Sequence, residues 1–222
     1  MSKNLKSVCR KIVAVGRNYL DHAKELGNKV ESSPIIFIKP SSCIIEEGEQ
    51  IRLPNGSTEV HHEVELGLVI GKSLTQVKAE EVHSAILGYV IALDLTDRLL
   101  QKQLCSNGLP WTMAKCFDTA CPVGSILPLE SLPVGFLTSR QEFQKINSEI
   151  WLRVNKIERQ RSKLNMMIWT PADLVSIITR RISLEYGDLV LTGTPAGVGP
   201  LKSGDEVEAS LDSLCPIRFG VK

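Results

Sequence analysis

Short aliphatic runs, most of them closed by glycine or proline, recur along this sequence and favour a fold made mainly of β-strands. Ile12–Val15 ends at Gly16, and Pro34–Lys39 ends at Pro40. Runs of about four to eight apolar residues between turn residues are typical of strands. The same signs predict further strands at Glu63–Ile70, Tyr89–Asp94, Asp188–Leu191, Glu206–Leu211 and Pro216–Val221. Charged and aliphatic residues alternate in Glu63–Ile70, which predicts a half-buried strand there.

Three segments carry helical signals. Tyr19–Leu26 and Ala79–Leu87 are both predicted to be helical. A third helix is expected to begin after Thr170, which suits the N-cap. Pro171 suits the first helical turn, and Asp173 complements the positive end of the helix. An apolar stripe at helical spacing follows these residues.

Because the predicted strands outnumber the predicted helices, we expect a β-rich α+β fold. The 222 residues have the length of one domain. Residues 1–10 are expected to be a terminal extension, and the polar, poorly periodic stretch 132–150 a surface insertion or a flap. Only 5% of the residues are aromatic, so valine, isoleucine and leucine must build most of the core.

The charge is nearly balanced, with 26 basic and 25 acidic residues and a net charge of +1. Nucleic-acid binding relies on a clustered basic surface, so this balance argues against a nucleic-acid partner. A composition of 43% hydrophobic and 23% charged residues excludes a disordered chain. No apolar run approaches the roughly 20 residues of a membrane span, so no membrane partner is expected.

The six cysteines are scattered and form no CxxC pair. This favours reduced thiols inside a cell over a secreted disulfide framework. The first eleven residues contain four basic residues and no acidic one, which is compatible with a very short organelle presequence or with a solvated basic terminus. The expected location is therefore the mitochondrial matrix or the cytoplasm.

The four histidines form no HxxxH pair, so a structural zinc site is excluded and carboxylates must hold any metal. Glu63 and Glu65 are two residues apart on a predicted strand, which places both side chains on one face. Asp94 ends the next apolar strand. Three converging carboxylates are suitable ligands for Mg²⁺ or Mn²⁺. The alternative is that the glutamates line a solvated face and that Asp94 caps a helix.

His22 and Glu25 are three residues apart, and on a helix they would lie on one face. A carboxylate beside an imidazole can orient a general base; the alternative is an exposed surface pair. His61 and His62 adjoin Glu63, but neighbouring strand residues point to opposite faces, so at most one of them can face the carboxylates.

Two further features are open to two interpretations each. The segment 192–199, TGTPAGVG, offers hydroxyl and backbone N–H groups that can hold a carboxylate or a phosphate, or it is simply a tight turn. It lacks the Walker and dinucleotide-binding patterns. Lys115 lies among apolar residues, where it can face an anionic substrate or extend to solvent.

Several segments in the same order make the chain similar to the fumarylacetoacetate hydrolase family. The resemblance runs from about Lys11 to the C-terminus. It rests on VGRNYLDHAKEL, IIFIKPSS, HHEVELGLVIG, GYVIALDLTDRLLQ, GLPWTMAKCFDTACPVG and LVLTGTPAGVGP.

The resemblance implies twisted, mostly antiparallel sheets that form a β-roll or sandwich with short helices, in a single catalytic domain and a homodimer. It implies that Mg²⁺ or Mn²⁺ is bound by Glu63, Glu65 and Asp94. It further implies that His22 and Glu25 lie on a short lid helix and that Lys115 faces the substrate. The pocket would be lined by Arg17, Tyr19, Gln101 and Thr194.

The implied activity is the hydrolysis of the C–C bond of acylpyruvates (2,4-dioxo acids), together with decarboxylation of oxaloacetate at the same site. In this scheme His22, oriented by Glu25, activates the water, and Lys115 with the metal stabilises the pyruvate enolate. The alternatives are an oxaloacetate keto–enol tautomerase or another hydratase, isomerase or decarboxylase of the family. A catalytically silent scaffold is the alternative outside the enzymes.

The sequence departs from the family pattern at three places. Leu99 replaces an aspartate, so an ion pair with Arg98 is expected to be missing. The segment 161–165 lacks the usual glycine and threonine, and 132–150 is longer than in relatives.

Overall fold

The computed structural model describes residues 4–21, 33–133 and 135–222. Its largest sheet has seven strands and is antiparallel except for two parallel pairs, β1 with β11 and β3 with β8. This confirms the prediction of a β-rich α+β fold with mostly antiparallel sheets. The strand order is β2 (Ile35–Pro40), β1 (Lys11–Gly16), β11 (Leu189–Leu191), β5 (Val64–Ile70), β6 (Ile86–Leu93), β8 (Cys121–Val123) and β3 (Ile44–Glu46).

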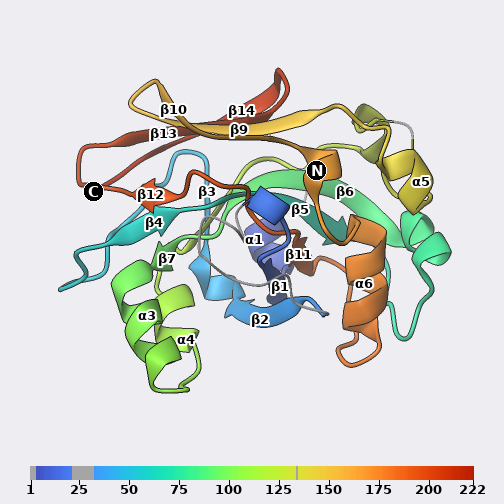
Figure 1. The fold of residues 1–222 in the computed structure, drawn as a ribbon, viewed down its shortest axis with the longest axis horizontal. Helices are drawn as coiled ribbons and strands as arrows, with labels where there is room; N and C mark the ends of the chain where they lie inside the picture. The colour runs from blue at the N-terminus through green and yellow to red at the C-terminus, as the bar shows by residue number, and fades with distance from the viewer. Residues whose placement is uncertain (1–3, 22–32, 134) are drawn as a thin grey trace.

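A second sheet of four strands covers one side of the curved strands β5 and β6 (Figure 1). A third, small sheet lies beside it. The four-stranded sheet has the order β10 (Ile157–Lys163), β9 (Glu149–Val154), β13 (Glu206–Leu211) and β14 (Leu214–Gly220), and the small sheet the order β12 (Gly199–Pro200), β4 (Val60–His62) and β7 (Thr96–Asp97).

The described helices are short. In α6 the Thr170 hydroxyl accepts from the backbone N–H of Asp173, whose carboxylate in turn accepts from the Thr170 N–H, so the predicted helix start is confirmed. Ala79–Ala85 is a 3-10 helix rather than an α-helix. None of the described helices is long and apolar enough to cross a membrane. The α-helices are α1 (Leu5–Val8), α3 (Arg98–Ser106), α4 (Thr112–Lys115), α5 (Arg140–Phe143) and α6 (Pro171–Thr179).

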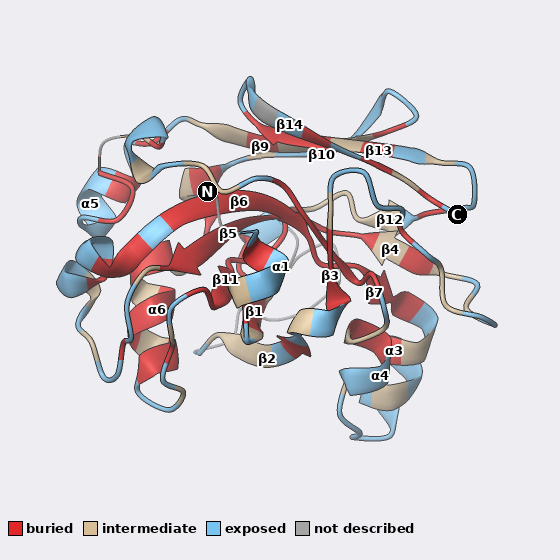
Figure 2. Ribbon diagram, turned by 180° about the vertical axis from the view of Figure 1, so that it is seen from behind, coloured by how far each residue is buried: buried red, intermediate tan, exposed pale blue. Residues whose placement is uncertain are grey.

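Strand β5 is buried on both faces, and the prediction of a half-buried strand was wrong (Figure 2). It lies between β11 and β6 within the large sheet, and β9 packs across it. A central strand covered in this way has no solvated face. The carboxylate of Glu65 therefore lies inside the protein.

The stretch 132–150 contributes to the core. It contains α5 and the start of β9, and the side chains of Leu137 and Phe143 are buried. The rings of Phe136 and Phe143 pack edge to face with their centroids 5.6 Å apart. Both phenylalanines belong to the main hydrophobic core, which anchors the described part of the stretch to the domain.

Candidate active site

Three carboxylates meet where β5 and β6 adjoin. Glu63 directly precedes β5, Glu65 lies in it, and Asp94 directly follows β6. The strands pair antiparallel with Val64 opposite Leu93, so the start of one strand adjoins the end of the other. The N–H of Asp94 donates to the Glu63 carbonyl at 2.9 Å. One oxygen from each carboxylate lies within 4.8 Å of the others, close enough to hold a divalent metal ion.

Three buried cations surround this cluster. The Lys115 ammonium is 3.0 Å from Glu63 Oε2 and 2.5 Å from Asp94 Oδ2. Arg98 pairs with the other oxygen of Glu63, and Lys39 Nζ is 2.7 Å from Asp94 Oδ1. Burial acts to lower the pKa of Lys115, but Asp94 and Glu63 outweigh it and raise this pKa. The three acidic and three basic groups are formally balanced.

Glu65 lies apart from these ion pairs. Its Oε2 accepts the backbone N–H of Gly193 at 2.6 Å, and the side chain is almost fully buried. Burial, and then the charges of Asp94 and Glu63, raise its pKa well above the usual value of 4.5. A divalent cation at the cluster would offset this cost, so the residues present fit a metal ion with oxygen ligands.

Lys39 is a component of the site that the sequence interpretation missed. Its side chain is completely buried, and its ammonium also donates to the carbonyls of Leu95, at 3.2 Å, and of Lys115. It thus joins β2 to Asp94 and to the end of α4. The available signal was a lysine at the end of an apolar strand, which is weak because lysine is rarely buried without a partner.

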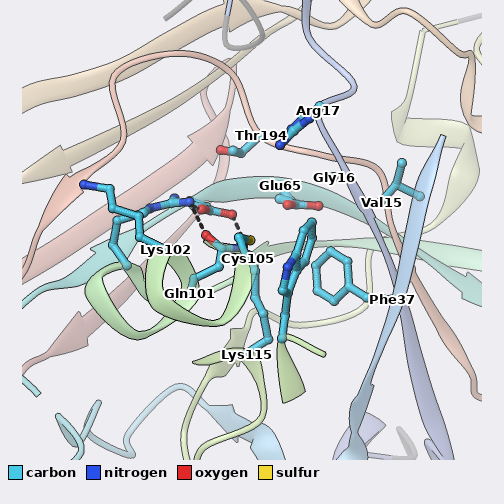
Figure 3. Close-up of a pocket in the computed structure, with 13 residues that line it drawn as sticks. Val15, Gly16, Arg17, Phe37, Glu65, Gln101, Lys102, Cys105, Lys115 and Thr194 are labelled. Carbon is cyan, nitrogen blue, oxygen red and sulfur yellow. Dashed lines mark hydrogen bonds and ion pairs between the residues drawn. The ribbon is translucent and has the colours of Figure 1, made fainter. Parts of the chain in front are cut away.

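A pocket of about 290 Å³ opens beside the carboxylates (Figure 3). Arg17 and Thr194 lie on one side of Glu65, and Lys115 lies on the other. The Lys115 ammonium is 4.8 Å from the centroid of the Phe37 ring. The pocket is lined by Val15, Gly16, Arg17, Phe37, Glu63, Glu65, Arg98, Gln101, Lys102, Cys105, Trp111, Lys115 and Thr194.

The other residues implied by the resemblance fall into two groups. Tyr19 is not among the lining residues: it is buried, and its hydroxyl has no hydrogen-bond partner in the part of the chain that the structure describes. Burial, and secondarily Glu65, raise the pKa of Tyr19. His22 and Glu25 lie outside the described residues.

The adjacent histidines contact groups other than the three carboxylates. His62 is buried with Nδ1 2.9 Å from Gln160 Oε1, and burial lowers the pKa of His62 to about 4. His61 Nε2 is 3.0 Å from Glu59.

Two departures from the family pattern have a clear structural setting. Leu99 is 43% exposed on α3, while Arg98 turns inward to Glu63 and donates to Gln101 Oε1 at 2.6 Å. The arginine therefore has acidic and amide partners that do not depend on residue 99. The segment 161–165 ends β10 and begins a 3-10 helix, Leu164–Met166, whose first residue is buried.

Known proteins share this fold and much of this sequence. The family model of the fumarylacetoacetate (FAA) hydrolase C-terminal domain matches residues 11–222. The mitochondrial oxaloacetate tautomerase FAHD1 of Mus musculus is 40% identical over 213 residues, covering 96% of this chain and 92% of that protein. The mitochondrial oxaloacetate decarboxylase of Dictyostelium discoideum is 40% identical over 206 residues, covering 92% of this chain and 90% of that protein.

A solved structure is similar over the same length. Fumarylpyruvate hydrolase from Pseudomonas aeruginosa, in complex with Mn²⁺ and pyruvate, superposes with a TM-score of 0.86 and is 34% identical, covering 96% of this chain and 89% of that chain. On the match over residues 11–222 and these identities, the chain belongs to the fumarylacetoacetate hydrolase family of enzymes.

Proposed function

We propose that the chain is a divalent-metal-dependent enzyme that acts on short 2-oxo acids through an enolate, with oxaloacetate keto–enol tautomerisation as its first activity. The observation that carries the proposal is the cluster of Glu63, Glu65 and Asp94 beside a pocket lined by Arg17 and Lys115. Relatives about 40% identical over nearly the whole chain are named oxaloacetate tautomerases, which supports this choice of substrate.

Glu63, Glu65 and Asp94 would hold the metal, for which Mg²⁺ or Mn²⁺ suits three carboxylate ligands. When bound, the cation withdraws electron density from a chelating 2-oxo acid and so acidifies its C3 protons. With three acids and three cations already balanced, a divalent ion leaves a formal local charge of +2. That charge favours a substrate with two negative charges, such as oxaloacetate.

The chain's own residues then bind the substrate and stabilise its charge. Arg17 and Thr194 lie on the same side of the pocket and can together hold a carboxylate (Figure 3). Lys115, on the opposite side, can place its ammonium near the oxygen that becomes negative when C3 loses a proton. Phe37 and Trp111, whose ring centroids are 5.9 Å apart, form the apolar wall beside Lys115.

A second candidate activity is the hydrolysis of acylpyruvates. The i, i+3 spacing of His22 and Glu25 favours it, as does the similarity to fumarylpyruvate hydrolase. His22 would take a proton from water, whose oxygen adds to C4. The C3–C4 bond then breaks to release a carboxylic acid and the pyruvate enolate, which gains a proton at C3. Loss of CO₂ from oxaloacetate yields the same enolate without water.

The proposal is tested by following oxaloacetate ketonisation in the ultraviolet with Mg²⁺, Mn²⁺ or EDTA. We expect turnover with either ion and almost none with EDTA or in Glu65→Gln. Glu130→Gln, at an exposed acid, is the matched control and should behave as the wild type. Full turnover in EDTA would refute the metal-dependent scheme. No turnover, with equal thermal stability with and without Mg²⁺, would favour the silent scaffold.

Acetylpyruvate separates the two candidate activities. If His22 activates water, His22→Ala should abolish acetylpyruvate hydrolysis and leave oxaloacetate tautomerisation and decarboxylation largely intact. Equal loss of all three would show that the residue is not specific to water activation. We further propose a mitochondrial location, supported by the names of the relatives; the homodimer stays a prediction.

A further inference from the structure

Gln160 is the single buried residue of β10. The pairing of β10 with β9 shifts register between Glu158 and Gln160, which is the mark of a β-bulge. The backbone here also meets the 192–199 segment closely: a Cβ on Gly197 would lie 2.1 Å from the Arg159 carbonyl oxygen. At this point of β10 the Gln160 amide contacts Thr194, a residue that lines the pocket.

All four hydrogen-bonding positions of the Gln160 amide are occupied. Its Oε1 accepts from the backbone N–H of Val64 at 3.1 Å and lies 2.9 Å from His62 Nδ1. Its Nε2 donates to Thr194 Oγ1 at 2.8 Å and to the Pro195 carbonyl at 2.9 Å. A buried amide with every position satisfied is held in one orientation.

The backbone partners decide which end of the amide is which. The Val64 N–H can only donate, and the Pro195 carbonyl can only accept, so the NH₂ group must face Thr194. Thr194 Oγ1 is therefore an acceptor in this contact. Its own proton is left to be donated to another group. Since Thr194 lines the pocket, a ligand bound there can accept this proton.

We propose that Gln160 is a positioning residue that fixes the Thr194 hydroxyl as a hydrogen-bond donor to a substrate carboxylate in the pocket. The inference rests on the proposed function, because the carboxylate belongs to a 2-oxo acid. The neighbouring Gly193 N–H holds Glu65, so the hydroxyl is set next to a metal ligand. Arg17, on the same side of the pocket, supplies the positive charge that a carboxylate requires (Figure 3).

The probe is pyruvate, titrated calorimetrically in the presence of Mn²⁺. We expect Thr194→Val to weaken binding about 10- to 100-fold, the range for a hydrogen bond to a charged acceptor, and Thr194→Ser to restore most of it. Gln160→Met should weaken binding about tenfold, because the Thr194 hydroxyl can then turn to the freed Pro195 carbonyl. Gln160→Glu, which cannot donate when ionised, should do the same. Gln144→Glu, at an exposed glutamine, is the charge control.

A double-mutant cycle separates positioning from a general structural role. If Gln160 acts through Thr194, the double variant Gln160→Met/Thr194→Val should bind pyruvate within about twofold of Thr194→Val alone. In turnover of oxaloacetate, Gln160→Met should raise KM and leave kcat nearly unchanged.

The possible failures are distinguishable. Equal weakening by Gln160→Met in both Thr194 backgrounds would overturn the inference, as would wild-type affinity in the single Gln160 variants. If wild-type protein loaded with Mn²⁺ does not bind pyruvate, the proposed function and this inference fall together. Circular dichroism verifies that each variant is folded. If Gln160→Met does not fold, pyruvate binding by Gln160→Glu, compared with Thr194→Val and Thr194→Ser, decides whether Gln160 positions the hydroxyl.

Discussion

Replacing Lys39 by methionine tests whether this buried lysine holds the acidic cluster together. The ammonium contacts Asp94 at 2.7 Å, the Leu95 carbonyl at 3.2 Å and the Lys115 carbonyl, and no part of the side chain is exposed. Methionine keeps a similar volume but removes the charge and all three donors. One oxygen of Asp94 then remains buried without its cation, while Lys115 still pairs with the other.

The expected cost is the cost of an unpaired buried charge. Removing one partner of a buried ion pair destabilises a protein by about 3–5 kcal/mol. For a domain of this length, 1 kcal/mol shifts Tm by about 2–4 °C. Lys39→Met should therefore lower Tm by roughly 6–20 °C in EDTA. The loss should shrink when Mn²⁺ is added, because the ion then neutralises Asp94 in place of Lys39.

Urea and thermal unfolding, followed by circular dichroism, measure this effect. Lys202→Met, at an exposed lysine, is the matched control and should stay within about 0.5 kcal/mol of the wild type. If Lys39→Met in EDTA unfolds within about 1 kcal/mol of the wild type, the assigned role of Lys39 is refuted.

Three more predictions concern other parts of the fold. The pKa of Glu65 is raised in the folded state, so its contribution to stability is fully present below about pH 4.5 and is lost as the pH rises through the folded-state pKa. Glutamine carries no charge at any pH. In EDTA, Glu65→Gln should therefore unfold at a higher temperature than the wild type at pH 7, but not at pH 4. Gly197→Ala should lower the free energy of unfolding in urea by about 1–3 kcal/mol more than Gly204→Ala. Both glycines have a positive φ, but a Cβ would collide with backbone at Gly197 and meet nothing at Gly204. N-ethylmaleimide should label the exposed Cys105 before Cys9, a buried thiol whose pKa is raised by burial to about 11. Peptide mass spectrometry measures the two labelling rates, and equal rates would contradict this order. Because Cys105 lines the pocket, its labelling should also block pyruvate binding.

Local signals in the sequence were sufficient for several elements. The run at Ile12–Val15 lies in β1, and Glu206–Leu211 has the bounds of β13. The start of α6 followed from Thr170, Pro171 and Asp173, because a helix cap involves residues only a few positions apart. The burial of β5 was mispredicted, because it depends on β9, which comes about eighty residues later.

In the candidate site, too, the residue types were predictable from the sequence and their contacts were not. Residue type, local period and family pattern were enough to predict the β-rich class, the absence of a zinc motif and the candidate ligands Glu63, Glu65 and Asp94. The contacts between these residues are visible only in the folded chain, where the three acids meet within 4.8 Å, Lys39 pairs with Asp94 and Gln160 donates to Thr194. A buried charge or amide is tolerated only with partners, and here those partners come from segments far apart in the sequence, which local patterns do not reveal.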